Sequence, residues 1–189
     1  MVAAVTARLC RLALLLVLLS LPSAVFAHRD DEYLQATLVV IEPDDIRLQI
    51  NITPGIAVAE QVIAVIDRDR DGAISTKEAA GYAELLKRDL TVRLDGRKSE
   101  LKLTASEFVP PDELRTGSGI IQMEYSASFG PLAAGPHRLT LENRHLPAIS
   151  VYLINAARPR FATVEITRQK RADNQSVGEI EFTFHPFRP

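Results

Sequence analysis

The sequence predicts a mainly β (α+β) fold, an antiparallel β-sandwich with one inserted helix-loop-helix. About nine short segments between residues 33 and 185 are rich in alternating apolar or β-branched residues and are separated by turn residues, which is typical of a sandwich. One stretch, at about 54–89, interrupts this pattern with two short helical patterns on either side of an acidic loop. We therefore expect residues 28–189 to form a single domain with this stretch inserted between strands.

The expected strands follow from the period-two spacing of their apolar residues. In residues 46–53 the isoleucines and the leucine alternate with polar residues, so one face of that strand is expected to be buried. Turns at Pro43-Asp44-Asp45 and at Asp95-Gly96 predict two hairpins. The expected strands are Tyr33–Glu42, Ile46–Thr53, Leu90–Leu94, a segment through Leu101, Leu103 and Ala105, Gly119–Ser128, His137–Asn143, Val151–Asn155, Ala162–Gln169 and Gly178–His185.

The first 27 residues have the pattern of a secretory signal peptide. Arg8 and Arg11 precede an apolar run at residues 12–19, and a small-residue cleavage site that ends at Ala27 follows. The run is shorter than the ~20 residues that a membrane-spanning helix requires, and no later segment is more apolar. We expect cleavage after Ala27, a periplasmic or secreted location, and no membrane span in the mature chain.

The composition argues against several classes of function. The only cysteine, Cys10, would be removed with the signal peptide, so no thiol chemistry is expected. Two of the 22 basic residues would be removed with it, which leaves 20 against 24 acidic residues, a net charge of −4, and argues against nucleic acid as a partner. Ser118 lacks the flanking glycines of a nucleophile elbow, and no metalloprotease or phosphate-binding motif occurs, so we expect no enzyme.

The inserted stretch contains a calcium-loop pattern at residues 67–78. Aspartates stand at loop positions 1, 3 and 5, a glycine that permits a sharp turn at position 6, and a glutamate able to bind through both oxygens at position 12. Position 7 would supply a backbone carbonyl, and position 9 would act directly or through a water. The candidate metal ligands are Asp67, Asp69, Asp71, Ala73, Ser75 and Glu78, and the expected cofactor is Ca²⁺.

Apolar residues flank this loop at the spacing of two amphipathic helices. They are Ala59, Val62, Ile63 and Ile66 before it, and Ala79, Tyr82, Ala83 and Leu86 after it. From Val58 to Arg88 the chain resembles the EF-hand family, and the resemblance implies that the six residues above ligate calcium and that Ile74 is the apolar residue that pairs two loops. No second loop occurs, and Arg68 and Arg70 offset the charge, so we expect a modest affinity, about 10⁻⁴ to 10⁻³ M.

Two alternatives remain open at this stage. The loop could be an ordinary acidic turn in which Ser75 and Glu78 form a capping box, although this explains only two of the matched residues. His28, as a new N-terminus, would offer an amine and an imidazole to copper or nickel. The layout also resembles, weakly, the extracytoplasmic N-terminal regions of bacterial nickel permeases.

The leading hypothesis is a calcium-binding structural or interaction module, with another periplasmic or membrane protein as a candidate partner. The alternative is a periplasmic copper- or nickel-binding or transport-accessory protein.

Overall fold

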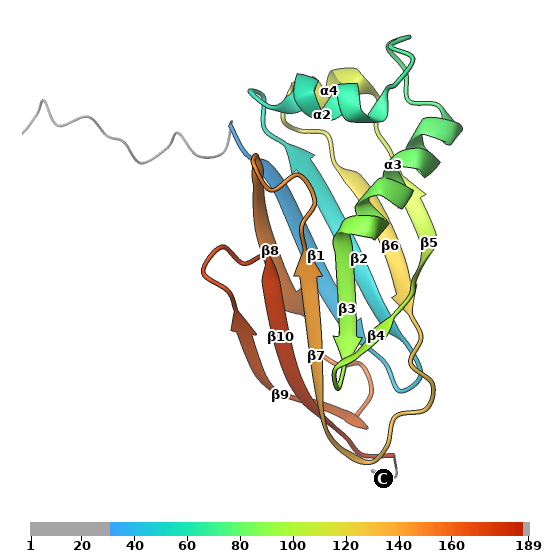
Figure 1. Ribbon diagram of the computed structural model, residues 1–189, viewed down its shortest axis with the longest axis vertical. Coiled ribbons are helices and arrows are strands. Elements are labelled where there is room, and N and C mark those ends of the chain that lie inside the picture. The colour runs from blue at the N-terminus through green and yellow to red at the C-terminus, as the bar shows by residue number, and fades with distance from the viewer. Residues whose placement is uncertain (1–30, 187–189) are drawn as a thin grey trace, which may run out of the picture.

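The computed structural model describes residues 31–186 and contains two five-stranded β-sheets (Figure 1). Sheet A is formed by β1 (Tyr33–Ile41), β2 (Ile46–Pro54), β5 (Leu101–Glu107), β6 (Ile121–Ala127) and β8 (Ser150–Ala156). Sheet B is formed by β3 (Leu90–Leu94), β4 (Arg97–Ser99), β7 (Gly135–Asn143), β9 (Val164–Arg171) and β10 (Val177–Phe184). The strand orders are β5-β6-β2-β1-β8 and β4-β3-β7-β10-β9. The prediction of a mainly β fold is confirmed.

Three helices of the described residues lie at one end of the sheets, and they are α2 (Ala59–Ile66), α3 (Thr76–Asp89) and α4 (Pro111–Arg115) (Figure 1). The first two are the predicted helices on either side of the acidic loop. The short α4 was not expected, because five residues are too few to show a helical repeat of apolar positions. The proposed signal peptide and His28 lie outside the described residues.

The expectation of purely antiparallel sheets is wrong at one pair of strands. β1 and β8 run parallel, with Tyr33 opposite Ser150 and Val39 opposite Ala156. After β7 in sheet B the chain returns to the start of β1, where the Tyr33 N–H donates to the Ile149 carbonyl at 2.8 Å. Apolar alternation determines which face of a strand is buried but says nothing about the direction of its partner.

The predicted second hairpin is correct only at its turn. Asp95 and Gly96 join β3 to β4, and their φ angles of 50° and 82° suit a tight hairpin turn. The returning strand is only the short β4, however. The segment through Leu101 and Leu103 continues as β5 into sheet A, where it pairs with β6. The apolar pattern could not predict that β4 and β5, which are so close in the sequence, belong to different sheets.

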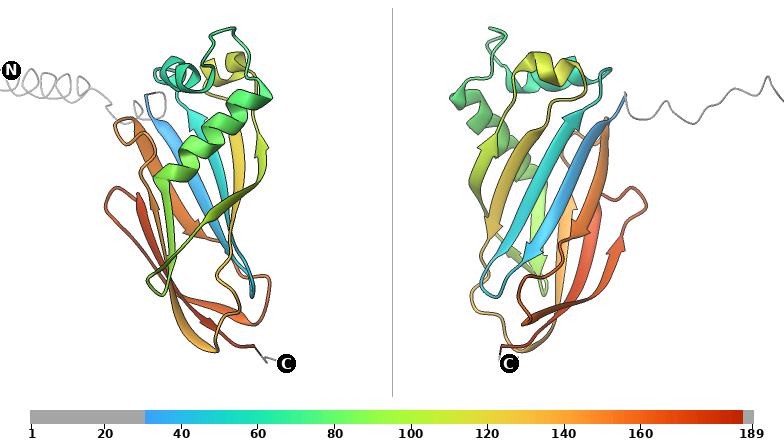
Figure 2. Two further views of the ribbon diagram at one scale, coloured as in Figure 1. Left: turned by 45° about the vertical axis from the view of Figure 1, so that its right-hand side comes forward. Right: turned by 180° about the vertical axis from the view of Figure 1, so that it is seen from behind.

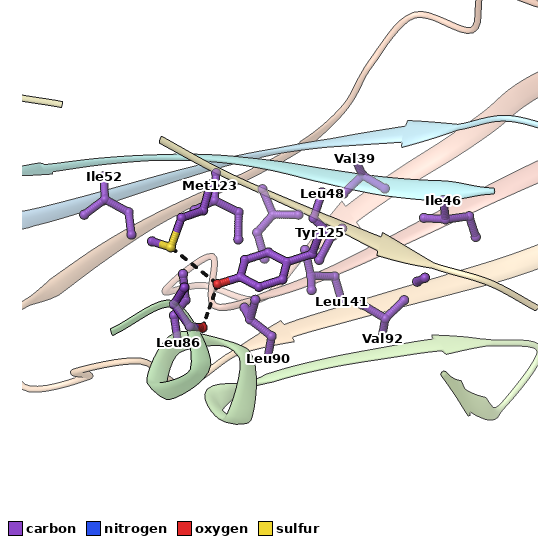
Figure 3. Close-up of a cluster of buried hydrophobic side chains, with 14 of the residues drawn as sticks. Val39, Ile46, Leu48, Ile52, Leu86, Leu90, Val92, Met123, Tyr125 and Leu141 are labelled. Carbon is purple, nitrogen blue, oxygen red and sulfur yellow. Dashed lines mark hydrogen bonds between the residues drawn. The ribbon is translucent and has the colours of Figure 1, made fainter. Parts of the chain in front are cut away.

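The hydrophobic core takes side chains from both sheets and continues beneath α3. Tyr125 on β6 lies among Leu48 of sheet A and Leu90, Val92 and Leu141 at sheet B (Figure 3). Its hydroxyl donates to the Ala83 carbonyl of α3 at 2.8 Å (Figure 3). This contact satisfies a buried polar group and ties the helix to sheet A.

The two sheets approach each other closely at Gly178, on β10. A Cβ added there would lie 2.5 Å from Cγ2 of Ile154, on β8, which is far inside normal contact distance. We expect Gly178→Ala to lower the free energy of unfolding by about 1–3 kcal/mol through overpacking. In an Ile154→Ala background, which lacks that methyl group, the same substitution should cost less.

A matched control is Gly81→Ala in α3, where no heavy atom lies within 4 Å of the added Cβ. That substitution should stabilise the protein by about 1 kcal/mol through helix propensity alone. Urea unfolding measures all of these variants. An equal loss from Gly178→Ala in both backgrounds would contradict the close approach of the sheets.

His137, on β7, links the β3–β4 turn to the loop that precedes β7 through two hydrogen bonds of its imidazole. Its Nδ1 lies 2.7 Å from Asp95 Oδ2, and its Nε2 lies 2.8 Å from the Ala133 carbonyl oxygen. Both partners are acceptors, so both hydrogen bonds form only when the imidazole is protonated. Burial lowers the pKa of His137, but the hydrogen bonds to Ala133 and Asp95 outweigh it and raise the pKa above its ordinary value.

The contribution of His137 to stability should therefore depend on pH. With a folded-state pKa above the unfolded value of about 6.5, the contribution is complete below that value and is lost as the pH rises through the folded pKa. The difference in Tm between the natural chain and His137→Gln should be largest near pH 5 and should shrink as the solution becomes alkaline. A difference that grew with pH would contradict a doubly hydrogen-bonded imidazolium.

Candidate metal site

The acidic loop lies between α2 and α3, at the end of the molecule where these helices cover the sheets (Figure 1). α2 buries the predicted stripe of Ala59, Val62, Ile63 and Ile66. α3 buries Tyr82, Ala83 and Leu86, and Ala79 is half-buried. Both helices therefore present their apolar faces to the protein core, and the loop between them faces solvent for most of its length.

Three of the predicted ligands come together in this loop. Carboxylate oxygens of Asp67, Asp69 and Asp71 all lie within 4.8 Å of one another. Asp67 is only 5% exposed, whereas the other two side chains are exposed. Across the described part of the chain, this is the one group of three or more acidic, histidine or cysteine side chains with such spacing.

Backbone N–H groups of the loop hold each of these carboxylates. Asp67 accepts hydrogen bonds from the N–H groups of Arg70, at 2.7 Å, and Gly72, at 3.0 Å. Asp69 accepts from the Asp71 N–H at 3.2 Å, and Asp71 accepts from the Ala73 N–H at 2.9 Å. Gly72 has a φ of +85°, which explains why a glycine is needed at the sixth position. The loop is thus folded around its own acidic side chains.

Glu78 lies outside this group of three. Its Oε1 accepts from the Arg68 N–H at 2.7 Å and from the Asp69 N–H at 3.4 Å. Its Oε2 accepts from the N–H and the hydroxyl of Ser75, at 3.0 and 2.7 Å. These bonds, those from Ser75 first, lower the pKa of Glu78 from its ordinary value to about 2, so the carboxylate is ionised.

The capping box expected as the alternative interpretation is present at the start of α3. The Ser75 hydroxyl accepts from the Glu78 N–H at 3.3 Å, and the Glu78 side chain accepts from the Ser75 N–H in return. Ser75 and Ala73 are exposed and lie outside the close group of aspartates. Ile74 is half-buried and packs against the core of its own chain rather than against a second loop.

The histidines of residues 31–186 are not gathered into a metal site. His137 pairs with Asp95, His145 is fully buried beside Asp89, and His185 lies 3.7 Å from Glu165. No described histidine belongs to a group with metal-ligand spacing. The copper or nickel hypothesis therefore has no support from these three residues.

A buried chain of hydrogen bonds fixes α3 at the end opposite the acidic loop. His145, in the connection between β7 and β8, lies 2.7 Å from Asp89 Oδ2 through Nδ1 and 2.9 Å from the Tyr82 hydroxyl through Nε2. The Tyr82 hydroxyl is in turn hydrogen-bonded to that of Tyr33, the first residue of β1. Where the Asp89 carboxylate is the acceptor, Nδ1 carries the proton and Nε2 accepts from Tyr82.

Burial opposes charge on the histidine and the two tyrosines of this chain. It lowers the pKa of His145, although the hydrogen bond to Asp89 acts in the opposite direction. Burial also raises the pKa of Tyr33 and of Tyr82. The partners are separated by 49 to 63 positions in the sequence, so no local spacing could have predicted the chain.

No protein-family model matches the chain, and a search of curated proteins found no match. Within residues 31–186, no helix is both long enough and apolar enough to cross a membrane. A function for this protein therefore rests on the chemistry of its own residues.

Tyr82→Phe should lower the free energy of unfolding by about 1–3 kcal/mol, because His145 Nε2 and the Tyr33 hydroxyl would be left buried without their partner. Tyr152→Phe is the matched control. The Tyr152 hydroxyl donates to the His145 carbonyl, which also accepts from Gln35 and Ser150, so its loss should cost less. Urea unfolding compares the two variants, and equal losses would argue against a special role for Tyr82.

Proposed function

We propose that residues 58–88 form an EF-hand-type calcium site in a secreted or periplasmic structural or interaction module. The observation that supports this most directly is the approach of Asp67, Asp69 and Asp71 within 4.8 Å of one another between two helices. Carboxylates so close together repel one another, and a divalent cation between them removes that repulsion. The proposed cofactor is Ca²⁺, and no enzymatic role is proposed.

The donor set favours calcium over other metal ions. It consists of oxygen atoms only, from the three aspartates, Ser75 and Glu78 and from the Ala73 carbonyl. Oxygen donors suit hard cations, whereas copper, nickel and zinc favour nitrogen or sulfur. Mg²⁺ requires a compact octahedron and retains several waters, whereas a twelve-residue loop with a terminal glutamate suits the larger coordination shell of Ca²⁺.

Glu78 has to exchange hydrogen bonds for the ion. To bind through both oxygens, it would give up the N–H groups of Arg68 and Asp69 on Oε1 and share Oε2 with Ser75. This exchange, together with the exposed guanidinium groups of Arg68 and Arg70, supports an affinity of about 10⁻⁴ to 10⁻³ M. Such a site would be filled at the calcium concentrations of extracellular fluids.

The proposed role of the ion is a static clamp. α3 is tied to the core by Ala83 and by Tyr82 and Asp89, so the ion would join the end of α2 to a helix that is already fixed. Two sheets with a shared core support the β-sandwich form of the domain. The location outside the cytoplasm is proposed from the pattern of residues 1–27.

The test is a calcium titration followed by thermal unfolding and calorimetry. We expect the Tm to rise with calcium, because a ligand at ten times its dissociation constant adds about 1.4 kcal/mol to the stability of the folded state. Magnesium at the same concentration should have a smaller effect. Asp69→Ala combined with Glu78→Gln should abolish the calcium response, since Gln can still accept hydrogen bonds from Ser75.

Asp173→Ala is the control, because Asp173 is an exposed aspartate far along the sequence from the loop. It should leave the calcium response unchanged. The calcium assignment is wrong if the natural chain shows no calcium-dependent rise in Tm, or if the loop variant retains the full rise.

A further inference from the structure

Sheet A leaves a broad face uncovered on the side that points away from sheet B (Figure 2, right). A groove of about 610 Å³ runs across this face and takes residues from all five strands. The groove is separate from the acidic loop, because none of the proposed calcium ligands lines it. The inference drawn from it therefore goes beyond the proposed calcium site and does not depend on it.

The strand registers arrange the side chains of this groove in two neighbouring rows across the sheet. The first row is Glu107, Gln122, Asn51, Ala36 and Leu153. The second row is Ala105, Glu124, Gln49, Leu38 and Asn155. Each row follows the order of the strands, from β5 at one edge to β8 at the other.

The chemistry of the first row changes in a regular way across the sheet. Both charged residues of the groove, Glu107 and Glu124, are acidic and lie on β5 and β6. Carboxamides occupy the centre on β6 and β2, and in the first row the aliphatic Ala36 and Leu153 follow on β1 and β8. The second row ends instead in Asn155, whose side chain accepts from Arg171. A molecule lying along the first row would meet negative charge, then amides, then an apolar surface.

The aliphatic part of the face departs from the rule for a solvated sheet. β1 alternates buried and partly exposed positions, and its outward residues are Leu34, Ala36, Leu38 and Val40. Leu38 is 39% exposed. An outward face in water normally carries polar residues, as sheet B does, where Arg138 is ion-paired with Glu179 and Glu181. Four aliphatic residues on one outward strand face, of which Ala36 and Leu38 line the groove, are unusual for a strand that only water covers.

Several polar groups of the groove are available to such a molecule. Among residues 31–186, Glu107 has no ion-pair partner, and the side chains of Asn51 and Gln122 have no hydrogen-bond partner. Glu124, in contrast, is shared with Gln49 at 3.2 Å and with Arg47 at 3.8 Å. The carboxylate at the edge of the sheet is thus the one that a cationic group would reach without displacing another residue.

We propose that this groove docks an extended peptide segment of a partner protein that carries a lysine or arginine at one end and aliphatic residues at the other. Four strand spacings of about 4.8 Å give a length of roughly 19 Å from β5 to β8. An extended chain places alternate side chains about 6.6 Å apart on one face, so about seven residues span this length. Their inward side chains would be basic, amide, aliphatic and aliphatic, in complement to the first row.

The probe is the peptide acetyl-Arg-Ser-Gln-Ser-Val-Ser-Leu-amide, together with the same sequence in reverse, since the direction of the chain is open. Titration of ¹⁵N-labelled protein should shift backbone amide signals of β5, β6, β2, β1 and β8 and leave those of β9 and β10 unchanged. A peptide with Glu in place of Arg should bind at least three-fold more weakly. The shifts should be the same with calcium and with a chelator.

Glu107→Lys and Leu38→Lys should each weaken binding of the better peptide at least three-fold, the first through charge and the second through the apolar contact. Glu100→Lys, just before the opposite end of β5, is the control and should leave binding unchanged. All three positions are exposed, so Tm should hardly change. The proposal is overturned if neither peptide shifts the sheet A signals, if Leu38→Lys binds normally, or if the face instead mediates self-association of the protein without peptide.

Discussion

The attachment of α3 to the two sheets is the constraint on which the remaining structure depends. The Ala83 carbonyl of the helix accepts a hydrogen bond in the core, and the half-buried Asp89 at its end bonds to the buried His145, which in turn bonds to Tyr82. Buried polar groups have to find partners within the protein, so a displaced helix would leave several of them unsatisfied at once. The position of α3 is therefore set by discrete hydrogen bonds as well as by apolar packing, and the start of α3 sets one side of the acidic loop.

The other side of that loop is held differently. α2 contributes apolar side chains to the core and packs near α4, where Glu60 and Arg115 form an exposed ion pair at 2.6 Å. Exposed ion pairs contribute little to stability, so α2 is held in place mainly by the burial of its apolar side chains. The two ends of the loop are therefore held by different kinds of contact, hydrogen bonds to buried groups at α3 and apolar packing at α2.

Much of the fold could be predicted from the sequence where one physical cause acts locally. The alternation in Ile46–Thr53 predicted β2 to within one residue, and the apolar spacing around Ile63 and Leu86 predicted both long helices. The loop pattern likewise predicted which aspartates come together. The parallel pairing of β1 with β8, the passage of β5 into sheet A and the role of His145 depend on distant partners. No local pattern encodes them, because the same alternation suits either direction of a neighbouring strand.

The parallel pairing of β1 with β8 also has a consequence for the order in which the chain can fold. Tyr33 lies opposite Ser150, so β1 waits for a neighbour that is synthesised much later in the chain. Hairpin pairing with β2 is available early, but the β8 side of β1 stays open until more than one hundred further residues have emerged. Non-local pairing of this kind slows folding. A nascent chain with this topology cannot complete sheet A until β8 has been synthesised.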